Sequence, residues 1–188
     1  MTGFCKTALV AVALVFATVA QAHDGHGLNA FHGGFVHPFI GLDHLLAMLA
    51  VGLWASTRPS SAAWQAPLVF VVMLAAGSIL TAGGLTLPLV EPVILLSLMT
   101  LGLMMAAARR IPARLGNPII GAFALFHGAA HGSEAAGAVP QALAGLLAAS
   151  AVLHLAGGCG GRFLSKTAYG YAGSGLAIAA AGLALAVG

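Results

Sequence analysis

The sequence predicts an all-α integral membrane protein, with six transmembrane helices in one bundle after a cleaved signal peptide. Of its 188 residues, 60% are hydrophobic and only 6% are charged, which is too little charge to cover a water-soluble domain of this size. The apolar residues also fall into runs of about 20, the length that a helix needs to cross a bilayer. No nucleic-acid partner is expected, because the cations of the mature chain lie in the connections between these runs and act as topology signals.

The first 22 residues have the order of a secretory signal peptide. A lysine precedes a short apolar run, and Ala20-Gln21-Ala22 supplies an A-x-A cleavage site. We favour cleavage after Ala22 over an uncleaved first helix. Cys5 then leaves with the signal, so Cys159 cannot form an intrachain disulfide, and we expect it to be a small apolar residue of the bundle.

A histidine-containing leader, residues 23–34, precedes the transmembrane domain of residues 35–188. The predicted spans are 35–56, 64–84, 88–108, 117–134, 139–160 and 167–187. All cations of the mature chain fall in the connections after the first, third and fifth spans, which the positive-inside rule places in the cytoplasm. Both ends of the mature chain are therefore expected to face outward.

Seven ionisable residues then lie at one depth, in the outer half of the membrane. They are His37, Asp43, His44, Glu91, His127, His131 and Glu134. At about 100° per residue, His37 and His44 lie two turns apart on nearly one line, and the three residues of the fourth span fall within about 60° of one another. Asp43 points elsewhere, so it either binds from a neighbouring angle or orients a histidine.

Neutral imidazole and carboxylate together suit divalent transition metals such as nickel, cobalt, zinc and copper. The alternative is a structural polar cluster, in which these side chains only form hydrogen bonds between helices. We favour a functional metal site, because one charge at the centre of a spanning helix costs at least about 2.5 kcal/mol.

Other histidines are less informative. His154 lies alone toward the cytoplasmic end of the fifth span, where a structural role and an exit-path contact are equally compatible with the sequence. The leader carries His23, Asp24, His26 and His32. These residues either capture metal outside the membrane or belong to a solvated segment, and we favour the solvated segment.

Two motifs resemble those of a known family. Residues 37–44 read HPFIGLDH, which resembles the H-P-x-x-G-x-D-H signature of the HupE/UreJ family of nickel and cobalt permeases. Residues 126–134, FHGAAHGSE, resemble that family's second His-rich motif. The resemblance implies a multi-pass permease of the bacterial inner membrane, with a periplasmic leader and periplasmic termini. It implies Ni²⁺ or Co²⁺ as cargo for hydrogenase or urease, no permanently bound cofactor, and the seven residues above as the metal site.

We therefore predict a secondary transporter and not an enzyme. The chain has no P-loop motif and does not hydrolyse nucleotide by that route. The alternative is an intramembrane zinc-dependent hydrolase that uses His127, His131 and a carboxylate, either Glu134 or Asp43. The sequence disfavours this alternative because Gly128 follows His127, so that no H-E-x-x-H motif is present.

Overall fold

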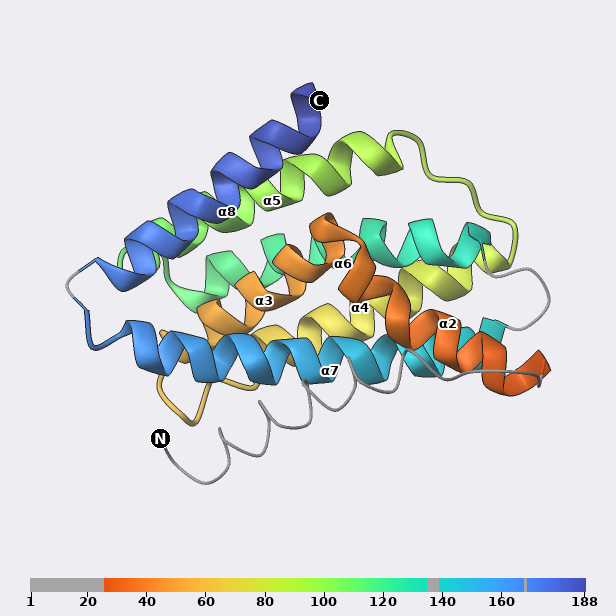
Figure 1. Cartoon of the computed structure of the whole chain (residues 1–188), viewed down its shortest axis with the longest axis horizontal. Coiled ribbons are helices and arrows are strands. Elements are labelled where there is room, and N and C mark those ends of the chain that lie inside the picture. The colour runs from red at the N-terminus through yellow and green to blue at the C-terminus, as the bar shows by residue number, and fades with distance from the viewer. Residues whose placement is uncertain (1–25, 135–138, 168) are drawn as a thin grey trace.

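The computed structural model describes residues 26–134, 139–167 and 169–188, and this part of the chain is all-helical (Figure 1). Its helices are α2 (His26–Ile40), α3 (Leu42–Ser56), α4 (Gln65–Ala82), α5 (Val90–Ala106), α6 (Ala113–Glu134), α7 (Val139–Leu164) and α8 (Gly170–Val187). The predicted signal peptide lies outside the described residues, and its cleavage stays a prediction.

Each predicted span contains helix, and the protein has the composition of a multi-pass membrane protein. By length and composition, α4, α7 and α8 suffice to cross a bilayer, and α2 with α3 would make a fourth span if the bent pair counts as one. Helix α5 is apolar but shorter, at 17 residues. The count of six spans therefore stays a prediction.

The first predicted span differs from the single straight helix expected over residues 35–56. Helix α2 ends at Ile40, α3 begins at Leu42, and the two are bent by 80°. Gly41 between them has the extended backbone of φ −75° and ψ 110°, and glycine gives a helix little intrinsic support. Helix α2 also begins at His26, so the predicted leader boundary at residue 35 falls inside a helix.

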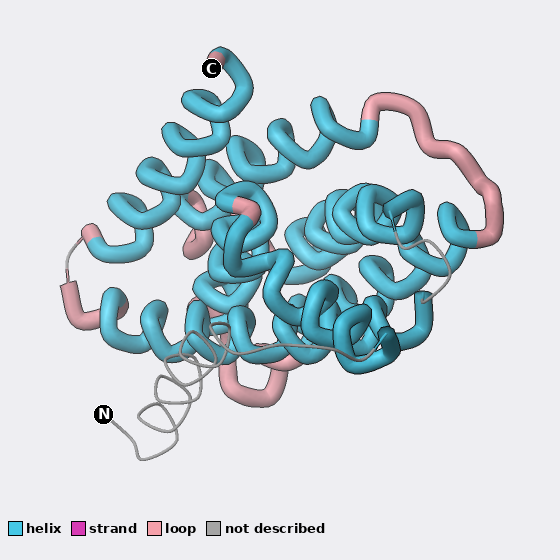
Figure 2. The backbone as a smooth tube through the Cα atoms, turned by 45° about the vertical axis from the view of Figure 1, so that its right-hand side comes forward, coloured by secondary structure: helices cyan, strands magenta, loops and turns pink. Residues whose placement is uncertain are grey.

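Helix α3 lies at the centre of the bundle. It packs against α7, α5, α4 and α8, while α4 pairs with α6, α5 with α8, and α2 with α7. Figure 1 shows α3 between the α5 and α8 pair and α7. Figure 2 shows the loop that leads from α4 to α5 at the edge of the molecule.

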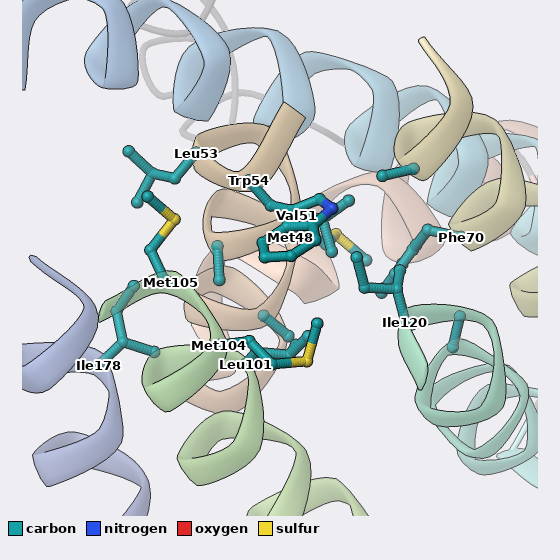
Figure 3. Close-up of a cluster of buried hydrophobic side chains, with 14 of the residues drawn as sticks. Met48, Val51, Leu53, Trp54, Phe70, Leu101, Met104, Met105, Ile120 and Ile178 are labelled. Atoms are coloured by element: carbon teal, nitrogen blue, oxygen red, sulfur yellow. The ribbon is translucent and has the colours of Figure 1, made fainter. Parts of the chain in front are cut away.

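Apolar side chains of α3 form the middle of the core. Met48, Val51 and Trp54 are almost fully buried and point between α5 on one side and α4 with α6 on the other (Figure 3). Phe70 of α4 and Ile120 of α6 complete this layer and are 0% exposed. On α3 this layer begins about one turn after His44, which is a residue of the predicted metal site.

Candidate metal site

Three histidines from three helices meet at one point. His37 on α2, His44 on α3 and His131 on α6 each offer a ligand atom, and these atoms all lie within 4.8 Å of one another. The ring centroids are 5.5 Å apart for His37 and His44, 4.7 Å for His37 and His131, and 4.6 Å for His44 and His131. We call these three residues the histidine triad.

A fourth histidine lies directly beside the triad. The ring of His127 on α6 is 4.8 Å from that of His44, centroid to centroid. Exposure falls in a definite order: His37 is exposed, His131 is partly buried, His44 is 5% exposed and His127 is 0% exposed. The group is therefore accessible at His37 and closed at His127.

Close packing of α4 on α6 places His127 and His131. Gly128 and Gly132 follow the two histidines, and a Cβ at either position would collide with the backbone carbonyl of Leu74 or of Ser78 on α4. The Ser78 hydroxyl also donates to the Gly128 carbonyl at 2.9 Å. The alternation of histidine and glycine thus supplies ligands on one side of α6 and a helix contact on the other.

Asp43 contacts its neighbour and lies outside the triad. Its Oδ1 accepts a hydrogen bond from the His44 backbone N–H at 2.8 Å and another from His44 Nδ1 at 2.9 Å. Because an ionised carboxylate only accepts, Nδ1 of His44 carries the proton. Of the two roles left open by the sequence, this geometry supports the orienting role.

Glu91, the predicted carboxylate of α5, does not join the histidines at this point. Glu91 is exposed in the first turn of α5. A negative charge at this position stabilises the helix by its interaction with the helix dipole. Glu134 is the last residue of α6, and its side chain lies outside the described part of the structure. The part of Glu134 in the metal site therefore stays a prediction.

The leader residues are placed only in part. His23 and Asp24 lie outside the described residues, and His26 is the first residue of α2. His32 lies on α2 and is partly buried, outside the triad. A capture role for these residues therefore stays as open as the sequence left it.

Two residues near the triad were not found from the sequence. Ser97 on α5 places its Oγ 2.9 Å from His127 Nε2, and Phe70 lies 6.1 Å from His127 and 5.0 Å from His154, ring to ring. Ser97 carries a hydroxyl group in an apolar run. The sequence therefore marks a polar position but does not show which group the hydroxyl contacts. Phe70 in an apolar helix has no distinguishing signal at all.

His154 lies beside Phe70, which also neighbours His127. It is 4% exposed, and neither ring nitrogen has a hydrogen-bond partner among the described residues. It also lines a cavity of about 590 Å³ between α3, α4 and α7, whose other lining residues include Ser56, Cys159 and Arg162. This position is compatible with the exit-path contact considered above.

The geometry of the triad suits a small divalent cation. Three imidazoles that each bind an ion at about 2.1 Å would have nitrogens no more than about 4.2 Å apart. The observed limit of 4.8 Å therefore requires only a small inward movement of the rings. Neutral imidazole nitrogens bind Ni²⁺, Co²⁺, Cu²⁺ and Zn²⁺, and the set contains no cysteine that would select a softer ion.

Comparison with known proteins identifies the same family as the two motifs. A family model described as "HupE / UreJ protein" matches residues 10–185. Protein HupE of Rhizobium leguminosarum bv. viciae is 41% identical over 199 residues, which cover 98% of this chain and 99% of that protein. No solved structure matches the chain.

Proposed function

The chain belongs to the HupE/UreJ family, and from this premise we propose that it imports Ni²⁺ across the bacterial inner membrane, with Co²⁺ as the alternative cargo. Family membership supports a transport role associated with these metals. The histidine triad supports it further, because its nitrogens come from three helices and lie within 4.8 Å. We propose hydrogenase or urease as the destination of the metal, and periplasmic termini for the mature protein.

Entry from the His37 side follows from the graded exposure of the four histidines. An ion would exchange part of its water shell for imidazole at the exposed end, where His37 is the first ligand it meets. Beyond His127 the apolar layer of Met48, Val51 and Phe70 is closed. Release to the cytoplasm therefore requires the helices around α3 to rearrange, as in alternating access.

The ligand set also suits release. Transport needs binding that is favourable enough to admit the ion and weak enough to let it leave. Three neutral imidazoles supply no negative charge, and among the described residues the carboxylate beside them, Asp43, is engaged with His44. The same engagement disfavours the form of the hydrolase alternative in which the Asp43 carboxylate activates water.

The test is accumulation of labelled Ni²⁺ at nanomolar concentration in bacterial cells that lack their own nickel importers. Wild type is compared with an Asp43→Ala, His44→Ala double variant, and with His32→Ala, which removes a histidine of α2 outside the triad. All are matched for protein in the membrane. We expect uptake by wild type and His32→Ala, and none by the double variant.

Co²⁺ and Zn²⁺ competitors in parallel samples report selectivity. If inserted wild-type protein gives no more uptake than cells without it, the transport proposal is wrong. Zinc content and hydrolytic activity of the purified protein would then be measured, because the hydrolase alternative predicts both.

A further inference from the structure

We propose that His44 and His127 form a second ion position deeper than the histidine triad, and that Ser97 is the positioning residue that prepares His127 for it. The inference rests on the proposed transport function and adds a step to it. An ion bound by the triad would pass inward by exchanging His37 and His131 for His127, while His44 remains bound throughout.

The hydrogen bonds of Ser97 fix the tautomer of His127. Ser97 Oγ lies 2.6 Å from the carbonyl oxygen of Ile94 and 2.9 Å from His127 Nε2. A serine hydroxyl has one proton, and a carbonyl can only accept. If Ser97 donated to His127, two acceptor oxygens would face each other at 2.6 Å with no proton between them. Ser97 therefore donates to Ile94 and accepts from His127 Nε2–H.

This assignment leaves Nδ1 of His127 unprotonated. That atom is buried and has no hydrogen-bond partner in the described part of the chain, so its lone pair is available to a cation. His44 is prepared in the opposite sense, because Asp43 accepts from its Nδ1 and leaves Nε2 available. His44 Nε2 is also buried without a partner among the described residues. Each of the two imidazoles thus keeps one unprotonated nitrogen available to a cation. Asp43 fixes the tautomer of His44, and Ser97 fixes the tautomer of His127.

The arrangement of the rings makes His44 common to both positions. It lies 4.6 Å from His131 and 4.8 Å from His127, centroid to centroid. His37 is exposed and His127 is 0% exposed, so a transfer from the triad to His127 moves the ion inward. Because the two positions share His44, an ion can move from one to the other without leaving the protein. Conduction through a binding site requires binding that is weak or spread over several positions.

Ser97 also connects α5 to the site. It is 0% exposed and lies on a helix that contributes no member of the triad. Loss of its hydroxyl should free the His127 ring to adopt either tautomer and other orientations. Outer partners of this kind typically change metal affinity or activity by 10- to 100-fold when replaced.

The first experiment measures Ni²⁺ uptake by Ser97→Ala in the importer-deficient cells. We expect the initial rate to fall about tenfold or more relative to wild type. The matched control is Ser150→Ala, which removes another 0% exposed serine hydroxyl, one without a hydrogen-bond partner in the described structure. We expect its uptake to stay close to that of wild type. Equal uptake by Ser97→Ala and wild type would overturn the inference and leave the transport proposal intact.

The second experiment reads the tautomer directly, so it does not depend on transport. The full chain is labelled with ¹⁵N-histidine in lipid nanodiscs without metal, and the His127 signals are assigned by their loss in His127→Gln. We expect the Nε2–H tautomer in wild type and in Ser150→Ala, and a mixture in Ser97→Ala. An Nδ1–H tautomer in wild type would overturn the inference even if Ser97→Ala did not fold. An unchanged tautomer in folded Ser97→Ala would do the same.

Discussion

The rings of His37 and His44 lie 5.5 Å apart and meet edge to face, although seven residues of a straight helix rise by about 10.5 Å. The 80° bend between α2 and α3 accounts for the difference. Because of this bend, two histidines of one predicted span approach the same point from different directions. The break at Gly41 is therefore a requirement of the site as much as a feature of the backbone.

The first prediction concerns Gly41→Ala. A Cβ at this position would lie 2.9 Å from Asp43 Oδ1 and 3.5 Å from His44 Nδ1, so the carboxylate must move away from the ring that it orients. Alanine also favours a continuous helix over a break. We expect Ni²⁺ uptake to fall about tenfold, measured as the initial rate at matched levels of protein in the membrane.

Gly33→Ala is the matched control, because it makes the same change on α2 where a Cβ would meet no atom within 4 Å. Its uptake should equal that of wild type. If both variants transport equally well, the contact between residue 41 and Asp43 does not govern the site.

The sequence predicted the helices better than it predicted the geometry of the site. The apolar runs placed the helices because each run is long and is separated from the next by glycine, proline or charged residues. The break at Gly41 was missed because glycine is common in transmembrane helices, and nothing in the residues around it separates a tolerated glycine from a break. The helical spacing therefore predicted that His37 and His44 lie close together, but for a straight helix that the structure does not have.

Contacts between helices explain the remaining differences. Depth along the chain suggested that Glu91 would join the histidines, but depth does not fix the face of α5 that turns inward. That face carries Ser97, whose hydroxyl reaches His127. Spacing within one helix can show which residues share a face, whereas the rotation of that helix against its neighbours depends on packing.

The second prediction concerns Asp43→Asn. The amide oxygen can still accept from the His44 ring, so the orientation of the ring should survive, but the negative charge that raises the basicity of the imidazole is lost. We expect a higher apparent KM for Ni²⁺, by about tenfold, with a smaller change in the maximal rate. Asp43→Ala removes the acceptor altogether, so it should also raise the apparent KM and should in addition lower the maximal rate. Identical kinetics for the two variants would mean that orientation by Asp43 has no separate effect.

The third prediction concerns external pH. An imidazole must be unprotonated to bind a metal, and the described titratable groups that face one another here are four histidines and Asp43. Protons therefore compete with the cation, and acidification should weaken binding. We expect uptake to decrease when the external pH is lowered from about 7.5 to about 5.5, because protons compete with a metal ion for imidazole nitrogen. Initial rates are measured in buffered cells at constant membrane potential. Uptake that increases on acidification would contradict simple competition and indicate coupling to proton entry.

The fourth prediction tests the helix crossing that supports the site. Gly52 of α3 lies against α7, where an added Cβ would collide with the His154 carbonyl and lie 2.9 Å from Gly157 Cα. Gly52→Ala should therefore force α3 and α7 apart, at a cost of about 1–3 kcal/mol typical of overpacked cores. We expect a lower melting temperature of the purified protein in detergent, and lower uptake because His44 is carried on α3.

Gly160→Ala on α7 adds the same methyl group where a Cβ would meet no atom within 4 Å and should melt like wild type. If Gly52→Ala also melts like wild type, α3 and α7 do not cross at this depth, and the position of His154 beside Phe70 would have to be revised.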